Sequence, residues 1–243
     1  MKITILNDDI SLKRQLEQGN EQQLQTVREV IQQVRTDGDA AIKYYSEKWD
    51  GFAPENLRVS EQEIVEAVKN FDKQLYFDLQ EAADNIRLYH NEQKRSGFRL
   101  PLADGSYLGQ RITPLDAVGL YVPGGSAAYP SSVLMNVIPA QVAGVKRIVI
   151  TSPAGNDGKL PDAVLVAAHI LGVTEIYKVG GAQAIAALAY GTETIAPVDK
   201  ITGPGNIFVA LAKREVFGEV AIDMIAGPSE ICVLADETAY ADE

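Results

Sequence analysis

From about residue 117 onward, the chain alternates short apolar runs with segments long enough to form a helix. The runs are typical of buried strands and recur roughly every 25 to 30 residues, the length of one strand followed by one helix. They lie at 118–122, 147–151, 175–179, 200–202, 220–224 and 231–234. Helix-length segments separate the first five runs, at 131–143, 161–171, 182–190 and 207–217. This alternation predicts an α/β fold with a mostly parallel sheet that helices cover on both faces.

The first 120 residues follow a different pattern. Apolar residues recur there at steps of three and four, which predicts amphipathic helices over 24–34, 42–49, 64–68 and 75–89. Ser60 followed by Glu63 is a capping-box signature and predicts where the third helix begins. Asp104 and Gly105 lie between apolar residues within 98–112 and predict a β-hairpin. We therefore expect a helical N-terminal region with a hairpin, followed by the parallel-sheet unit.

The charge and composition of the chain argue against several classes of function. The formal net charge of −11 repels a phosphate backbone, so we expect no nucleic-acid partner. No uncharged apolar stretch is long enough to span a membrane, and the N-terminus turns acidic too early for a signal peptide. The one cysteine, Cys232, excludes an internal disulfide and fits a reducing compartment. We expect a cytoplasmic protein without a membrane partner.

Glycine-rich loops follow four of the predicted strands, at 123–126, 180–183, 203–206 and 226–230. Ligands of an open parallel sheet bind outside the carboxyl ends of its strands, and glycine lets the backbone approach a ligand closely. For any one loop, a simple turn is the simpler interpretation, but four on one edge favour a polar-ligand site. The small polar side chains in these loops are Ser126, Gln183, Asn206 and Ser229. The ordinary dinucleotide fingerprint is absent, so the loops alone do not identify the ligand.

Catalytic and metal-binding patterns are missing from the sequence. The two histidines, His90 and His169, lie in separate predicted helices without a partner at ligand spacing, so we expect no metal site in this chain. Cys232 lies in an apolar run, which favours an inert core thiol over a nucleophile. Asp223 and Glu230 flank a glycine loop, where solvated strand ends are as good an explanation as a site. The residues taken alone predict a binding platform with no catalytic residue.

Four stretches of the chain resemble motifs of the histidinol dehydrogenases, in the order in which that family has them. They are 119–127, 179–189, 200–206 and 222–230, and the similarity is dense from about Gly109 onward. The resemblance implies oxidation of L-histidinol to L-histidine through an aldehyde, with two NAD and a bound zinc, by a homodimer. It implies incomplete Rossmann-like units in an architecture similar to aldehyde dehydrogenases. By the same resemblance, Tyr121, Gln183 and Asn206 would contact NAD, and Ser229 would contact the substrate.

The resemblance also implies a division of the chain into domains. Residues 1–120 would be the first half of a split domain, 121–229 an inserted NAD-binding domain, and 230–243 the return strand of the split domain. In the family, the zinc ligands and the proton-transfer pair follow the last of the four motifs, beyond Glu243. We therefore expect the parent enzyme to use zinc and NAD, and this chain alone neither to hold zinc nor to oxidise histidinol.

Two other functions stay open on the sequence. One is a related zinc and NAD dehydrogenase that acts on another polar alcohol, because this chain does not carry the residues that would read the imidazole and amine of histidinol. The other is a non-catalytic nucleotide-binding or assembly module. Growth of a histidine auxotroph that receives the gene would favour the histidinol dehydrogenase.

Overall fold

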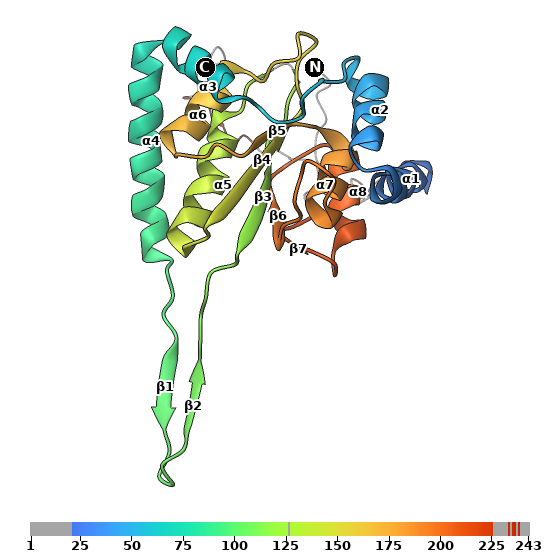
Figure 1. The fold of residues 1–243 in the computed structure, drawn as a ribbon. Coiled ribbons are helices and arrows are strands. Elements are labelled where there is room, and N and C mark those ends of the chain that lie inside the picture. The colour runs from blue at the N-terminus through green and yellow to red at the C-terminus, as the bar shows by residue number, and fades with distance from the viewer. Residues whose placement is uncertain (1–20, 126, 226–232, 234, 237, 239–243) are drawn as a thin grey trace.

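A five-stranded parallel sheet forms the centre of the molecule (Figure 1). The computed structural model describes residues 21–125, 127–225, 233, 235, 236 and 238. The strands run in the spatial order β5-β4-β3-β6-β7, and every pair is parallel. Their bounds are β3 Ala117–Tyr121, β4 Arg147–Ser152, β5 Ile176–Lys178, β6 Lys200–Thr202 and β7 Ala221–Ile222. The parallel α/β fold is thus confirmed, while the predicted strand at 231–234 lies outside the described residues except for Val233.

Helices follow the first four strands of this sheet, as the sequence predicts. They are α5 Pro130–Ala143, α6 Asp162–Ile170, α7 Gly181–Tyr190 and α8 Ile207–Val216. Alternate residues of β3 point to opposite faces: Val118 and Leu120 join the core with α5 and α6, whereas Ala117 and Tyr121 join the core with α7 and α8. The sheet therefore separates two apolar cores, one on each face.

The four N-terminal helices complete both cores. They are α1 Glu21–Asp37, α2 Asp39–Asp50, α3 Glu61–Asn70 and α4 Lys73–Glu92. Helices α1 and α2 pack on α7 and α8, whereas α3 packs on α6 and α4 packs on α5 (Figure 1). The predicted capping box opens α3, where the Glu63 amide donates to Ser60 Oγ at 3.2 Å and the Ser60 amide donates to the Glu63 carboxylate at 2.9 Å.

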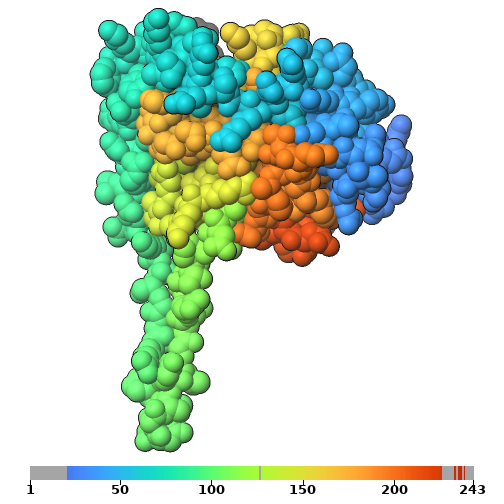
Figure 2. Space-filling view, viewed as in Figure 1, coloured from blue at the N-terminus to red at the C-terminus, as the bar shows by residue number. Residues whose placement is uncertain are grey.

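The predicted hairpin is also present, and it extends away from the rest of the molecule (Figures 1 and 2). Its strands, β1 Phe98–Pro101 and β2 Tyr107–Gln110, pair antiparallel, and each of their residues is exposed. Among the helices that the structure describes, none has the length and apolar character needed to cross a membrane. The division at residues 120 and 230 stays a prediction, because most of 230–243 lies outside the described residues.

Candidate functional site

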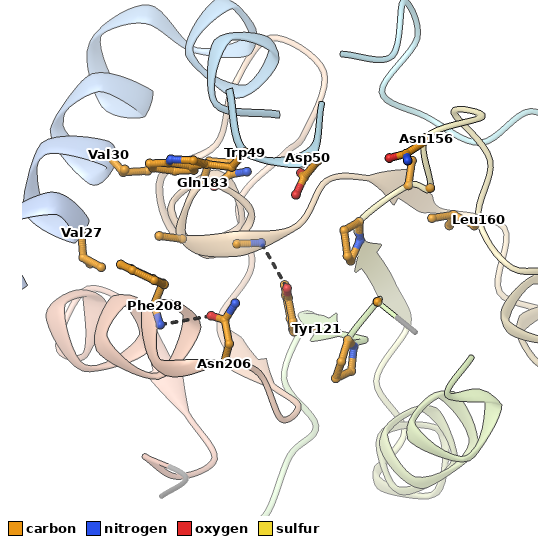
Figure 3. A pocket seen from close by; sticks show the side chains of 18 of the residues that line it. Val27, Val30, Trp49, Asp50, Tyr121, Asn156, Leu160, Gln183, Asn206 and Phe208 are labelled. Carbon is orange, nitrogen blue, oxygen red and sulfur yellow. Dashed lines mark hydrogen bonds between the residues drawn. The ribbon is translucent and has the colours of Figure 1, made fainter. Parts of the chain in front are cut away.

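A cleft of about 1190 Å³ opens at the carboxyl edge of the sheet (Figure 3). Its walls come from α1, the end of α2, the loops after β3 and β4, and the first residues of α7 and α8. The strand ends at Pro123, Gly180 and Gly203 lie on this one edge, as predicted, because all five strands are parallel. The first three glycine-rich loops and the cleft are therefore one feature of the described part of the chain.

Three glycines in these loops, Gly125, Gly181 and Gly203, have backbone conformations that other residues adopt only with strain, and two of them are also closely packed. Gly203 has a φ of +114°, and a Cβ atom there would lie 2.1 Å from the Tyr121 carbonyl oxygen. Gly181 has a φ of +64°, and a Cβ atom there would lie 2.6 Å from Gln183 Oε1. Gly203 lets the β6 loop pass beside the end of β3, and Gly181 makes room for the Gln183 side chain. Both are requirements of the site's architecture.

Tyr121 connects the end of β3 to the start of α7. Its hydroxyl accepts a hydrogen bond from the Gly181 amide at 3.1 Å (Figure 3). Burial raises the pKa of Tyr121 to about 12, the Gly181 hydrogen bond opposes this rise, and the nearby Asp50 carboxylate adds to it. The hydroxyl therefore keeps its proton at neutral pH and can donate it in a hydrogen bond to a ligand oxygen.

Gln183 presents an unpartnered polar atom at the wall of the cleft. The residue is 1% exposed, and its Oε1 has no hydrogen-bond partner among the described residues. A buried acceptor without a donor is destabilising by about 1–3 kcal/mol, so its presence here calls for a reason. A ligand that donates a hydrogen bond in the cleft would supply one.

Asn206 caps α8 at the same edge. Its Oδ1 accepts hydrogen bonds from the amides of Phe208 and Val209, both at 3.1 Å. Because capping uses the oxygen, the amide nitrogen is the atom that Asn206 can offer to a ligand. Tyr121 at the end of β3, Gln183 in the first turn of α7 and Asn206 at the N-cap of α8 all line the same cleft. Ser126, Ser229 and Glu230 lie outside the described residues.

Asp223 has a structural role in the described part of the chain. It forms an ion pair with Lys213, whose side chain is buried, and it accepts a hydrogen bond from the Gly203 amide at 2.9 Å. Lys213 Nζ also donates to the Gly203 carbonyl oxygen at 3.0 Å. These contacts hold the loop after β6 in place, and β7 itself is shorter than predicted, at Ala221–Ile222.

Sequence reasoning missed the contribution of the N-terminal helices to the cleft. Val27 and Val30 of α1 line it, together with Trp49 and Asp50 at the end of α2. Trp49 stacks on Tyr45 with 4.7 Å between the ring centroids. Helical periodicity marked Val27 and Trp49 only as members of apolar stripes and did not single out Val30 or Asp50. No sequence signal indicates that α1 and α2 reach a sheet edge formed more than 70 residues later.

The described residues do not provide a metal site. No group of three or more His, Cys, Asp or Glu side chains in that part of the chain is arranged to hold a metal ion. The zinc that the family resemblance implies therefore has no set of ligands among these residues.

Comparison with known proteins gives a consistent result. Residues 13–243 match the family profile described as histidinol dehydrogenase. The chain is 65% identical over 243 residues to the histidinol dehydrogenase of Geobacillus kaustophilus, covering 100% of this chain and 57% of that protein. It is 58% identical over 245 residues to that of Bacillus subtilis, with the same coverage of 100% and 57%. It thus spans about half the length of the curated relatives it matches.

A solved structure shows the same similarity. The chain superimposes on the crystal structure of histidinol dehydrogenase from Elizabethkingia anophelis with a TM-score of 0.84 and 38% sequence identity. The match covers 89% of this chain and 50% of that one.

Proposed function

Because this chain belongs to the histidinol dehydrogenase family, we propose that it binds NAD in the cleft and serves the oxidation of L-histidinol to L-histidine. One observation carries the proposal: polar side chains from the end of β3, the start of α7 and the cap of α8 converge on one cleft, where the buried Gln183 acceptor lacks a partner among the described residues. The cleft is also large enough for an extended dinucleotide, since ligand pockets usually measure about 300–1,000 Å³.

The residues of the cleft suit a dinucleotide without using a basic fingerprint. Helices α7 and α8 begin at the cleft, so their positive dipole ends favour a diphosphate there, although the Gly181, Phe208 and Val209 amides already donate within the protein. The Tyr121 hydroxyl and the Asn206 side-chain amide N–H would each donate a hydrogen bond to the cofactor. Gln183 Oε1 would accept from a hydroxyl or amide of the cofactor. Amide and hydroxyl groups can recognise ribose and carboxamide without carrying charge.

When bound, NAD accepts a hydride from the carbon that is oxidised, and oxidation of an alcohol to a carboxylate takes two such transfers. The described residues of this chain bind and orient the cofactor. They provide no zinc ligands, so no step is derived through that metal. Contact of Ser229 with the substrate, which the family resemblance implies, is part of the proposal and concerns a residue outside the described range.

We expect the protein to act as a homodimer in the cytoplasm. The β1–β2 hairpin supports the first expectation, because Phe98, Leu100, Tyr107 and Leu108 are each more than half exposed. A two-stranded hairpin is only marginally stable in water by itself, so an apolar one gains from packing against a second copy. The single cysteine, Cys232, fits a reducing compartment.

A direct test is titration of the 243-residue chain with NAD. The only tryptophan of the chain, Trp49, lines the cleft, so its fluorescence reports binding. Tyr121→Phe should weaken NAD binding roughly tenfold, as expected for loss of one well-placed hydrogen bond. Tyr107→Phe removes the same hydroxyl from an exposed hairpin position and should leave the affinity unchanged. If Tyr121→Phe and Tyr107→Phe bind NAD with equal affinity, the proposed cofactor site is contradicted.

The substrate and the dimer need separate tests. The gene of the full-length parent enzyme should restore growth of a histidine auxotroph, whereas the gene of a dehydrogenase of another polar alcohol should fail to do so. Light scattering of the chain should show a dimer. The double variant Phe98→Ser, Leu108→Ser should be a monomer. A monomer of the unchanged chain at high concentration would contradict the role of the hairpin.

A further inference from the structure

Asp50 is a charged residue in the cleft that neither the sequence motifs nor the proposed contacts account for. It is the last residue of α2, and Gly51 follows in the left-handed region with φ +71°, which ends the helix beside the cleft. Figure 3 shows the Asp50 carboxylate pointing toward the middle of the cleft, between Trp49 and Tyr121. It is half-buried, and no hydrogen-bond donor within the described part of the chain reaches it.

The position of Asp50 is unfavourable for the protein itself. A negative charge in the last turn of a helix opposes the helix dipole, and burial adds a desolvation penalty that raises the pKa of this carboxyl group. The Asp50 charge also acts on Tyr121, whose pKa it raises. A carboxylate only accepts hydrogen bonds, so a ligand that offsets these penalties must bring donors.

Asp50 lies beside the apolar part of the cleft, because it directly follows Trp49 in the chain (Figure 3). Val27, Val30, Trp49 and Phe208 form this part, which suits a flat base. In a dinucleotide, the group attached to the adenine base is a ribose, and its hydroxyls are hydrogen-bond donors. The ribose of a base held in the apolar part would therefore bring donors to the Asp50 carboxylate.

We propose that Asp50 binds the hydroxyls of the adenosine ribose and excludes a dinucleotide that carries a 2′-phosphate. The inference rests on the proposed binding of NAD. A 2′-phosphate would replace one donor with a group bearing roughly −1.5 to −2 charge, as on a phosphorylated side chain, and bring it against the carboxylate. The other charged residues among the described lining are Asp157 and Lys159, whose charges are opposite. Asp50 therefore gives these lining side chains a net negative charge.

The test is a titration of NAD and NADP into the 243-residue chain and its Asp50→Asn variant, read by Trp49 fluorescence and by calorimetry. Glu47→Gln is the matched control, because it removes one negative charge from the same helix at an exposed position outside the cleft lining. Thermal unfolding of each variant checks that it folds, and Asp50→Ser provides a second variant. Since the charge at position 50 is unfavourable for the fold, Asp50→Asn should be at least as stable as the parent chain.

We expect the parent chain to bind NAD at least about tenfold more tightly than NADP, in line with a charge-assisted hydrogen bond that only NAD makes. Asp50→Asn should weaken NAD binding and reduce the difference to about threefold or less, while Glu47→Gln keeps it. If Asp50→Asn keeps both the NAD affinity and the preference, the inference fails and the proposed NAD site stands. An equal loss in Glu47→Gln would assign the effect to net charge and also overturn the inference. If the parent chain binds neither dinucleotide, the proposed function fails with it.

Discussion

Helix α7 and the β1–β2 hairpin are both short and rich in apolar residues, yet they differ completely in burial. Residues 182–188 of α7 are all buried, between the sheet on one side and α1, α2 and α8 on the other. Every residue of the two hairpin strands is exposed. The difference follows from the surroundings of each segment and not from its hydrophobicity.

Each region has one feature that its surroundings do not explain. In α7, it is a polar atom where apolar groups are expected, the buried Gln183 Oε1. In the hairpin, it is apolar surface where polar groups are expected, including Phe98 at 61% and Leu108 at 60% exposure. Buried polar groups and exposed apolar patches are the informative exceptions in a folded protein. We infer that the first exception belongs to a ligand site and the second to an interface.

The most direct test of this difference adds one methyl group to a glycine in each region. Gly203→Ala should destabilise the fold by more than about 3 kcal/mol, because its Cβ atom would overlap the Tyr121 carbonyl oxygen in a left-handed conformation. Gly105→Ala, in the hairpin turn, has φ +85° and no atom within 4 Å of the added Cβ, so only backbone strain of about 1–2 kcal/mol remains. Urea unfolding of both variants measures the difference. Equal losses would show that strain, and not close packing, governs Gly203.

A second pair of variants compares the apolar side chains themselves. Leu188→Ala should cost about 2–5 kcal/mol, because Leu188 is fully buried in α7 and packs against Gly119 of β3. Leu108→Ala, on the hairpin, should change the unfolding free energy of the dilute chain by less than about 0.5 kcal/mol. Chemical denaturation at low protein concentration makes this comparison without association. A large loss for Leu108→Ala would mean that the hairpin is covered even in dilute solution.

The sequence predicted the elements well where the pattern is local. The strand and helix periods, the Ser60 capping box and the turn at Asp104 and Gly105 each depend on residues a few positions apart. The parallel topology followed from the repeated strand and helix spacing, and it placed the glycine-rich loops on one edge. Gln183 and Asn206 could be selected for that reason, whereas Tyr121 was selected by the family resemblance alone.

The sequence could not predict what depends on packing across long separations. Nothing local indicates that α1 and α2 cover α7 and α8, and therefore that Val27, Val30, Trp49 and Asp50 line the cleft. The ion pair between Lys213 and Asp223 was missed for the same reason, since a lysine on an amphipathic helix normally faces solvent. The burial of Gln183 also depends on helices that pack around α7 only in the folded chain.

A third prediction uses pH to compare two tyrosines. The raised pKa of Tyr121 means that its contribution to stability is fully present below pH 10 and is lost as the pH rises from 10 to about 12. At pH 11 the loss should be roughly 1.4 kcal/mol, the equivalent of one pKa unit. Tyr121→Phe should make stability fall less steeply over this range, whereas Tyr107→Phe on the exposed hairpin should not change the slope. Denaturant unfolding between pH 9 and about 11.5 measures it.

The smallest expected change in stability concerns Gln183, and it has the opposite sign. Gln183→Met replaces a buried, unpartnered amide with an apolar side chain of similar length, which should stabilise the free chain by about 1 kcal/mol. The same change removes the acceptor proposed for NAD and should weaken NAD binding roughly tenfold.

Gln93→Met is a suitable control because Gln93 is exposed at the end of α4 and outside the cleft lining. It should change neither quantity by more than about 0.5 kcal/mol. A gain in stability together with a loss of binding is the signature of a residue kept for a ligand, since replacing a purely structural glutamine would lower the stability and leave binding unchanged. If Gln183→Met is destabilised and binds NAD as tightly as the parent chain, the buried amide serves the fold. The inference that the polar exception in α7 belongs to a ligand site is then wrong.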